Sequence, residues 1–486
     1  MTLLITWILD NLQLLIAGIY VGMSTAVTIH AILWKRDTKA AVGWIGLAWL
    51  SPFIGSFSYY LFGINRIQRR AVELSTRKAW RGAQRLHLTD QETVQKELFL
   101  AHPQAGSMIQ LSRHLSRRYI LPGNSILPLV NGDEAYPKML AAIASAKKSV
   151  SLQSYIFDND AIGIQFVTAL AEAQKRGVAV RVMVDGVGVR YSKSPNILKP
   201  LRDAGLKHAL FLPTRIPRLP NTANLRNHRK IMVVDGVHGF TGGTNIRAGH
   251  CLNIGVKSPA QCLHFSLTGP VASHLQQTFA VDWAFATGES LQGEAWFQNN
   301  ERCGDSWARG INHGPDEDFE KLSDLLVGAL SMARESVHII TPYFLPPAAL
   351  TQVLAVTAMR GVEVNILLPS RNNIRIMDWA TQAEIGPLLE KGCNIIVTPE
   401  PFDHTKLLVV DDAWSLIGST NWDQRSLRLN FEFNVECYDR DLAMQLKTIF
   451  TDKAANGRQL RLSDINDRSL AVKFRDGAAR LWAPYL

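Results

Sequence analysis

Two short segments of the sequence place a histidine and a lysine two residues apart, at the start of an apolar run. They are NHRKIMVVDG at 227–236 and DHTKLLVVDD at 403–412. Because residues i and i+2 of a strand point to the same face, each histidine should project together with its lysine. A single pair of this kind is more often a surface feature, but two copies with one spacing favour a shared chemical role. The candidate catalytic residues of the two pairs are His228, Lys230, His404 and Lys406.

The similarity between the two segments extends beyond the lysine. Each has an aspartate five residues after the lysine, Asp235 and Asp411, and a turn of small residues seven further on, GGTN at 242–245 and GSTN at 418–421. Small residues allow the backbone to approach an oxyanion closely, and the asparagine amide that ends each turn can donate to it. The candidate phosphate-binding residues are Gly242, Gly243, Asn245, Gly418, Ser419 and Asn421.

These residue types suit attack on a phosphate without a metal ion. Two lysines can neutralise the non-bridging oxygens as charge develops. One imidazole can attack phosphorus and form a covalent intermediate, while the other protonates the leaving alcohol and then deprotonates the incoming one. The sequence has no HExxH motif, no carboxylate cluster with metal-ligand spacing and no P-loop, so we predict neither a metal ion nor another cofactor.

The segments around the motifs alternate between helical and strand-like patterns, and the order repeats along the chain. The first copy predicts helices at 135–148 and 161–177 and strands at 149–157 and 178–186; the second predicts a helix at 316–335 and strands at 336–344 and 360–370. Asp235-Gly236 adds a hairpin turn signal. We therefore predict an α/β fold with two similar halves, 126–290 and 310–455, each a mixed, mostly parallel sheet sandwiched by helices.

The N-terminal 62 residues differ from the rest of the chain. Residues 12–34 and 40–62 contain no formal charge, and each run is long enough to cross a bilayer as a helix. We predict a two-helix membrane hairpin over 1–62, which puts the N-terminus and the main domain on the same side of the membrane. A basic linker is predicted to follow at 63–125.

The charge of the chain favours anionic partners. The net charge is +10 and the pI is about 9.4, which is typical of binding to nucleic acid, an acidic membrane surface or phosphate-bearing substrates. The basic flank after the second predicted span is larger than the KRDTK loop at 35–39, so the positive-inside rule favours the cytoplasmic face for the main domain. The C-terminal segment 456–486 mixes apolar and basic residues and is a candidate membrane-surface segment. The five cysteines lack C-x-x-C spacing and indicate neither a disulfide framework nor a zinc site.

The paired motifs resemble the HKD motifs of the phospholipase D superfamily. Both HxKxxxxDxxxxxxGGxN and HxKxxxxDxxxxxxGSxN fit that pattern. Further stretches resemble bacterial cardiolipin synthases: NGDEAYPKMLAAIASAKKSV, QSYIFDND, TGPVA, TPYFLP and NWDQRSLRLNFE. The predicted membrane hairpin fits the same family. The resemblance covers most of the chain, is tightest from about 126 to 445, and implies two phospholipase D-like halves.

This resemblance implies a phosphatidyltransferase of the bacterial inner membrane that requires no ATP, CDP-alcohol or metal. One phosphatidylglycerol would donate its phosphatidyl group to an enzyme histidine and release glycerol, and a second would accept the group to give cardiolipin. By the superfamily pattern His228 is the nucleophile and His404 the acid and base, although the near-symmetry of the motifs leaves the reverse assignment open. The acceptor lipid, phosphatidylglycerol or phosphatidylethanolamine, and the oligomeric state are also left open.

The resemblance assigns a supporting role to the remaining motif residues and exposes one departure. Asp235 and Asp411 are expected to support the site, and Glu432 to orient the histidine of its own half. In the first half the family commonly has an aspartate two residues before a histidine, where this sequence has Cys262 before His264. Because a thiol cannot replace an orienting carboxylate, the way in which His228 is held is left open.

Two other classes of protein fit parts of the sequence. A phospholipase D-type hydrolase or nuclease would use the same residues, since transfer and hydrolysis differ only in the hydroxyl that resolves the intermediate. The predicted membrane hairpin and the lack of an aromatic-and-basic stripe disfavour a nuclease, so no nucleic acid partner is expected. Two complete motifs disfavour a membrane scaffold without catalytic activity.

Overall fold

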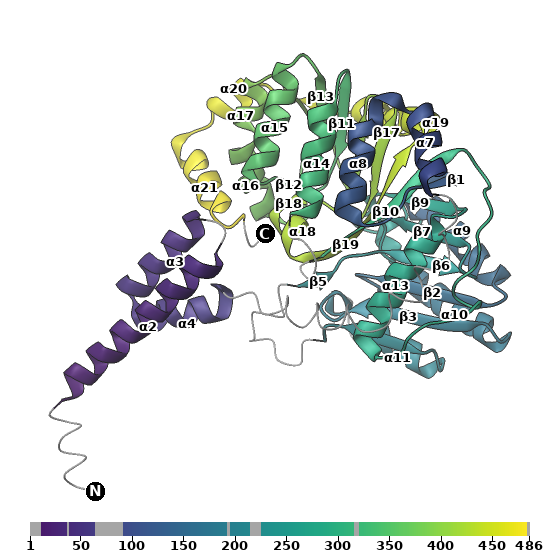
Figure 1. Cartoon of the computed structure of the whole chain (residues 1–486), viewed down its shortest axis with the longest axis horizontal. Helices are drawn as coiled ribbons and strands as arrows, with labels where there is room; N and C mark the ends of the chain where they lie inside the picture. The colour runs from purple at the N-terminus through teal and green to yellow at the C-terminus, as the bar shows by residue number, and fades with distance from the viewer. Residues whose placement is uncertain are drawn as a thin grey trace, which may run out of the picture. The chain divides into compact units, whose positions relative to one another are not determined.

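The computed structural model describes residues 11–35, 38–63, 91–191, 195–213, 225–314 and 320–483. It divides into two compact units. The described part of the first unit consists of the N-terminal helices, and the second unit contains both histidine-lysine motifs (Figure 1).

The first unit contains one long helix and two short ones. They are α2 (Leu12–Trp34), α3 (Thr38–Leu50) and α4 (Pro52–Ser58), and α4 continues into a π-helical turn at Tyr59–Gly63. Among the described residues, α2 alone is long and apolar enough to cross a membrane. The second predicted span, 40–62, is not one helix, because α3 ends before Ser51 and a new helix begins after it. Pro52 then starts α4 at a first-turn position, where its missing N–H is not needed.

The second unit is built on one twisted sheet that runs through both halves (Figure 1). In spatial order its main path is β20 (Arg458–Gln459), β14 (Asn394–Thr398), β13 (Glu363–Pro369), β11 (Ser336–Ile340), β16 (Leu407–Val410), β17 (Trp414–Gly418), β19 (Asn430–Tyr438), β10 (Ser306–His313), β1 (Leu121–Val130), β9 (Leu263–Thr268), β7 (His238–Gly242), β6 (Ile231–Val234), β2 (Ser149–Ser154), β3 (Ala179–Asp185) and β4 (His208–Phe211). The short strand β5 (Arg226–Asn227) pairs with β19. The two predicted sheets are therefore joined into one, through β1 and β10.

The sheet is mixed, as predicted, but most of its ladders are antiparallel rather than parallel. Parallel pairing is confined on the main path to β2–β3–β4 in the first half and β11–β13–β14 in the second. The difference arises at the motifs, because the chain doubles back after Asp235 and after Asp411 and makes the hairpins β6–β7 and β16–β17. These hairpins place each histidine-lysine segment beside the centre of the sheet.

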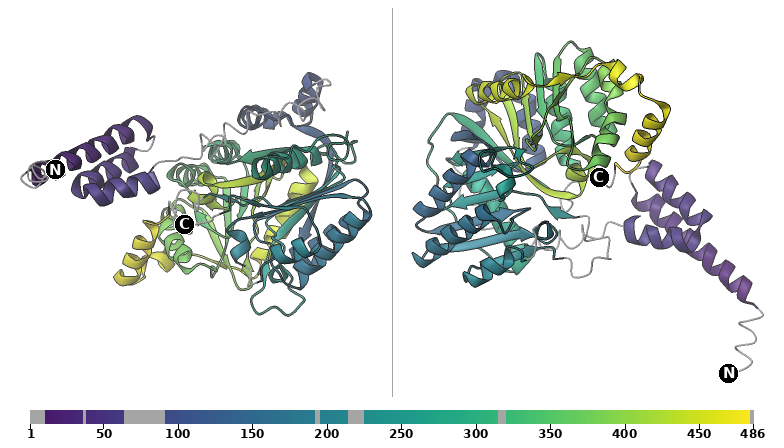
Figure 2. Two further views of the ribbon diagram at one scale, coloured as in Figure 1. Left: turned by 90° about the horizontal axis from the view of Figure 1, so that it is seen from below. Right: turned by 180° about the vertical axis from the view of Figure 1, so that it is seen from behind.

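Helices cover both faces of the sheet (Figure 2). One face packs against α13 (Ala272–Thr287) and α19 (Arg440–Ala454), and the core there takes residues from both halves, including Phe279, Trp283, Phe433 and Leu446. The opposite face is covered in the first half by α9 (Asn131–Ser145) and α10 (Ala161–Lys175), and in the second half by α14 (Lys321–Met332) and α15 (Ala348–Met359). The shared core ties the halves together at the position where the motifs meet.

Part of the segment predicted as a linker is folded onto the second half. Residues 64–90 lie outside the described residues, but α7 (Gln91–Ala101) and α8 (Gly106–Ser116) follow. Leu98, Met108 and Ile109 of these helices are buried in the same core as Leu325 of α14. These two helices therefore add to the core of the second half, although they precede β1 in the sequence.

Candidate active site

The two predicted histidines lie together at the junction of the halves. The backbone N–H of His228 donates to the Phe431 carbonyl at 2.9 Å, and that of His404 donates to the Gln261 carbonyl at 2.8 Å. Each histidine is thus pinned to a strand of the opposite half. Both side chains are buried, and their ring centroids are 6.5 Å apart.

The two lysines have equivalent positions beside the histidines. The ammonium of Lys230 donates to the carbonyl of His228, and that of Lys406 to the carbonyl of His404, each at 2.6 Å. Burial lowers the pKa of Lys230 to about 7 and that of Lys406 to about 8, and the positive charge of Lys406 contributes to the lowered pKa of Lys230. A phosphate anion placed between them would supply the missing counter-charge.

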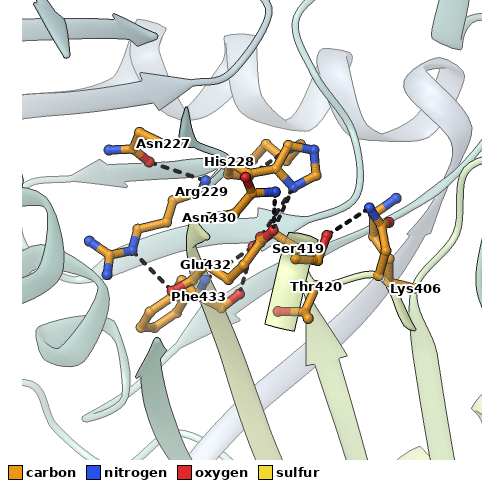
Figure 3. A network of polar contacts seen from close by, with 12 residues as sticks. Asn227, His228, Arg229, Lys406, Ser419, Thr420, Asn430, Glu432 and Phe433 are labelled. Carbon is orange, nitrogen blue, oxygen red and sulfur yellow. Dashed lines mark hydrogen bonds and ion pairs between the residues drawn. The ribbon is translucent and has the colours of Figure 1, made fainter. Parts of the chain in front are cut away.

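A carboxylate from the second half holds His228. The Nδ1 atom of His228 lies 3.0 and 3.1 Å from the two carboxylate oxygens of Glu432, which is completely buried in β19 (Figure 3). The Ser419 hydroxyl also donates to this carboxylate, as does the Asn430 amide at 3.2 Å. In a neutral ring that donates Nδ1–H to Glu432, the lone pair of Nε2 is free to attack.

Protonation states in this pair agree with that arrangement. Burial lowers the pKa of His228 to about 4, although Glu432 acts in the opposite direction. Burial alone would raise the pKa of Glu432, but the interactions with His228 and Lys230 hold it below its usual value. At neutral pH the site therefore combines an ionised Glu432 with a neutral His228.

His404 has a different partner. Its Nδ1 atom lies 3.0 Å from the Gly243 carbonyl, so a neutral ring donates that proton to the backbone. The Cys262 thiol is also close, with Sγ 4.0 Å from the same nitrogen. Burial, followed by the charge of Lys406, places the pKa of His404 well below its usual value. The two histidines are thus held by unlike groups.

This asymmetry corrects the expected role of Glu432 and answers the question raised by Cys262. Glu432 orients the histidine of the other half, His228, rather than that of its own half. Cys262 is the counterpart of Glu432, because it precedes β9 beside His404 just as Glu432 lies beside His228. The histidine without a carboxylate partner at this position is therefore His404, whereas His228 has Glu432.

The small residues of the two turns allow close approach at the site. A Cβ at Gly243 would lie 2.7 Å from Cys262 Sγ and 2.9 Å from the His404 carbonyl. Gly242 and Gly418 have φ values of 144° and 157° and leave no room for a Cβ against the neighbouring strand. Substitution at any of the three would push a strand end away from the histidines.

The two asparagines brace the loops around the histidines. The side-chain oxygen of Asn245 accepts a hydrogen bond from the Ile156 N–H at 3.1 Å, and the amide of Asn421 donates to the Ser426 hydroxyl at 3.1 Å. Both asparagines are buried. Their described contacts are therefore with the chain, at positions next to the small residues.

The two motif aspartates lie away from the histidines, at the far ends of β6 and β16. The Asp235 carboxylate accepts hydrogen bonds from the backbone N–H groups of residues 147–149 at 2.7–3.2 Å. Asp411 accepts from residues 334–336 in the same way, at 2.8–3.0 Å. Each aspartate therefore fixes the turn between a helix and the next strand, and neither is placed to touch a substrate at the histidines.

The structure adds residues that the motif analysis did not single out. The ring of Tyr155 lies 5.0 Å from that of His228, and the ring of Tyr343 lies 6.5 Å from that of His404. Their equivalent places in QSYIF and TPYFL could have identified them. Below the site, buried Arg229 pairs with Asp282 at 2.5 Å and donates to the Glu432 carbonyl at 3.0 Å, which helps to position β19. Among the described residues, no group of three or more His, Cys, Asp or Glu side chains is arranged to hold a metal ion.

Comparisons with known proteins agree with this geometry. The fold is similar to the crystal structure of the phosphatidylserine synthase of Haemophilus influenzae, with a TM-score of 0.60, 13% identity, and coverage of 78% of this chain and 100% of that one. Two motif-bearing halves that share one site define a phospholipase D-type enzyme. The family model described as "Cardiolipin synthase, PLD-like domain" matches residues 139–283 and 326–453.

Curated relatives narrow the class. Cardiolipin synthase 2 of Bacillus cereus is 30% identical over 93% of this chain and 88% of its own length. The major cardiolipin synthase of Bacillus subtilis is 29% identical over 93% of this chain and 95% of its own. The chain belongs to the bacterial cardiolipin synthase family of the phospholipase D superfamily, and it is a phosphatidyltransferase.

Proposed function

We propose that this site transfers a phosphatidyl group from one phosphatidylglycerol to the hydroxyl of another, which yields cardiolipin and glycerol. The observation that carries the proposal is the burial of two histidine-lysine pairs side by side, with one histidine on a carboxylate. Phosphatidylglycerol and other anionic membrane lipids are then the partners of the site.

In the first step, Nε2 of His228 attacks phosphorus of the donor lipid. The bond between phosphorus and the glycerol headgroup oxygen breaks, and that oxygen takes a proton from His404, so glycerol leaves. Lys230 and Lys406 stabilise the negative charge on the non-bridging oxygens. Glu432 stabilises the positive charge that develops on the imidazole of His228.

In the second step, His404 removes a proton from the glycerol hydroxyl of a second phosphatidylglycerol. This oxygen attacks phosphorus, the bond to His228 breaks, and cardiolipin forms. His404 begins this step neutral and ends it protonated, ready to act again as an acid. Binding of the anionic phosphate raises the low pKa of His404, because the phosphate offsets the two lysine charges.

The unlike partners of the histidines support His228 as the nucleophile. A phosphorylated imidazole carries positive charge that a carboxylate on Nδ1 can offset, and Glu432 occupies that position at His228. A proton-transfer group must instead gain and lose a proton easily, and the neutral Gly243 carbonyl accepts the Nδ1 proton of His404 in both states without a charge that would keep the ring protonated. The near-symmetry of the motifs is therefore broken at these two contacts.

Product analysis tests the proposed reaction. Purified full-length protein is supplied with phosphatidylglycerol labelled in its headgroup glycerol and, separately, in its acyl chains. Equal amounts of cardiolipin and free glycerol are expected. Phosphatidic acid as the main acyl-labelled product would establish hydrolysis instead, and a mixed product from added phosphatidylethanolamine would identify a broader phosphatidyltransferase. The His228→Ala variant serves as the inactive control.

We also propose that the enzyme is bound to the bacterial inner membrane through its N-terminal helices, with the second unit on the cytoplasmic face. The apolar helix α2 and the basic residues that follow it support this location. A lipid substrate and a membrane-bound enzyme share one surface, so the donor and acceptor lipids can enter the site from the bilayer.

The C-terminal helix supports a second membrane contact, on the bilayer surface. In α21 (Leu470–Arg480), one face packs on α16 (Arg375–Glu384) through Ala479, while the other exposes Leu470 (82%) and Phe474 (78%). Lys473 and Arg480 flank this apolar face. Apolar residues flanked by cations are typical of helices that lie on an anionic membrane.

The position of α21 relative to the site supports the same contact. α21 packs on α16, which in turn contacts β12 (Phe344–Leu345), and β12 pairs with β18 (Trp422–Asp423) beside Asn421 (Figure 1). The exposed face of α21 therefore lies at the end of the second unit that carries the loops of the site. A bilayer bound there would be close to the histidines.

A further inference from the structure

The short helices of the first unit do not have the lengths that two membrane crossings require. With 23 residues, α2 is about 35 Å long, which exceeds the roughly 30 Å of the hydrocarbon core. With 13 residues, α3 is about 20 Å long. The 7 residues of α4 and the 5 of the π-helical turn span about the same distance. Neither α3 nor α4 alone can cross.

The contacts of α4 show that it folds back along α3. A Cβ at Gly55 would lie 2.3 Å from the Leu47 carbonyl oxygen, so the two helices touch there. One turn further along the chain, at the start of the π-helical turn, the ring of Tyr59 lies 5.4 Å from that of Trp44. Moving forward along α4 therefore means moving backward along α3. The two helices form an antiparallel hairpin with its tip at Ser51.

The tip of this hairpin reaches only part of the way along α2. The Ser24 hydroxyl donates to the Ala48 carbonyl at 2.7 Å, and the Tyr20 hydroxyl donates to the Trp49 carbonyl at 2.5 Å. The end of α3 thus lies beside the Tyr20 side chain, and the N-terminal turns of α2 continue past it (Figure 1). If α2 spans the bilayer, the tip lies inside the hydrocarbon region.

The chemistry of the hairpin agrees with a tip in lipid and two ends in water. The tip exposes Leu50 (87%) and Ile54 (69%), and its sequence LSPFI has no charge. By contrast, the connection before α3 is KRDTK at 35–39, and the sequence after Gly63 continues with a further basic cluster at 66–81. If the tip were a loop in water, we would expect polar or charged residues there, because exposed apolar side chains cost free energy in water.

We propose that α2 crosses the membrane once, and that α3 and α4 form a re-entrant hairpin that enters and leaves on the side of residues 35–39. The N-terminus then lies on the opposite face from the second unit. This path also agrees better with the positive-inside rule. In a two-span hairpin, the basic clusters at 35–39 and 66–81 would lie on opposite sides of the membrane, whereas on the re-entrant path both lie on the side of the second unit. The residues before α2 contain no Lys or Arg, so the positive-inside rule places that face in the cytoplasm.

Cysteine accessibility in the full-length protein tests this path. Four of the five native cysteines are buried, and the exposed Cys303 reports the face of the second unit. Two further reporters, Thr6→Cys and Thr38→Cys, are made separately in a Cys303→Ser background and labelled with a membrane-impermeant maleimide in intact spheroplasts and in inverted vesicles. Phosphatidyltransferase activity of each variant shows that it has folded.

The two paths predict opposite patterns. The re-entrant path predicts that Thr38→Cys is labelled in the same preparation as Cys303, inverted vesicles, and that Thr6→Cys is labelled in spheroplasts. Labelling of Thr6→Cys together with Cys303, with Thr38→Cys on the opposite face, would overturn the proposal and establish two crossings. Because labelling does not depend on the reaction, the outcome is independent of the proposed function.

Discussion

At the scale of single residues, the site is asymmetric at the Nδ1 atoms of its two histidines. His228 has the Glu432 carboxylate, and His404 has the Gly243 carbonyl with Cys262 nearby. The rest of each motif is nearly the same, including the contact from each lysine to the carbonyl of its histidine. The division of work between the histidines therefore depends on these partners, and each can be changed by substitution.

Replacing Glu432 by glutamine should reduce kcat by roughly 10- to 100-fold, by analogy with the loss of a carboxylate that orients a metal-bound histidine. The amide keeps the shape but removes the charge that stabilises a cationic His228. Steady-state kinetics on phosphatidylglycerol measure the effect. Ser419→Ala, which removes a hydroxyl donor to the same carboxylate, is the control and should cost less. Equal kcat in Glu432→Gln and the parent would contradict the role of Glu432.

The pKa values of the lysines predict an unusual pH dependence. With pKa values of about 7 and about 8 in the free enzyme, Lys230 and Lys406 lose their positive charge as the pH rises through this range. Phosphate binding needs that charge, so kcat/KM, which reports the free enzyme, should decrease with rising pH and should decrease more steeply above pH 7. A profile of kcat/KM that stays flat up to pH 9 would disagree with these lowered pKa values.

A carboxylate at position 262 should change the behaviour of His404. In Cys262→Asp the new negative charge replaces a thiol whose Sγ lies 4.0 Å from Nδ1 of His404, which raises the pKa of that imidazole. His404 then stays protonated to higher pH, so the alkaline limb of the pH profile of kcat should shift to higher pH. Cys262→Ser has a similar size without the charge and should leave the limb in place. The same limb in both folded variants would mean that residue 262 does not influence His404.

The sequence predicted the residues of the site better than their connections. The histidines and lysines could be found because the spacing in HxK repeats, and the structure brings these four residues together. The partner of His228 could not be found in this way, because Glu432 is 204 positions away and belongs to the other half. Spacing within a segment carries no information about which half supplies a contact.

At the scale of elements, the hairpins that follow the motifs explain both the success and the error in the predicted fold. Alternating helices and strands correctly indicated α/β halves, and parallel pairing occurs where helices connect β2 to β3 and β11 to β13. The turns at Asp235 and Asp411 reverse the chain and make the centre of the sheet antiparallel. The Asp-Gly turn was visible in the sequence, but its consequence for the whole sheet depends on long-range strand pairing.

The C-terminal helix α21 provides a test at this scale. A fluorophore attached at Phe474→Cys, in the Cys303→Ser background, should shift to the blue when the full-length protein is placed in phosphatidylglycerol-containing vesicles, because Phe474 faces outward and would enter the bilayer surface. Spin-labelled lipid should then quench it. Met444→Cys, an exposed apolar position on α19, is the matched control and should remain in water. The same water-like spectrum at both positions would contradict membrane contact by α21.

At the scale of the whole molecule, one chain supplies both motifs, and each half holds the histidine of the other. The backbone of His228 is bonded to β19 of the second half, and that of His404 to Gln261 of the first half. A complete site therefore exists within one protomer, and the chemistry does not require a dimer. Substitutions that separate the halves should affect both histidines together.

The central claim is that a phosphatidyl group is carried on His228 during turnover. The most direct measurement mixes the full-length enzyme with phosphatidylglycerol labelled at phosphorus and stops turnover rapidly in a denaturing detergent at mildly alkaline pH, where the acid-labile bond between phosphorus and histidine survives. Peptide mapping at the same pH then locates the label. We expect the label on the peptide that contains His228, and none in His228→Ala. Label on the peptide that contains His404, or turnover to cardiolipin without any protein-bound label, would contradict the mechanism.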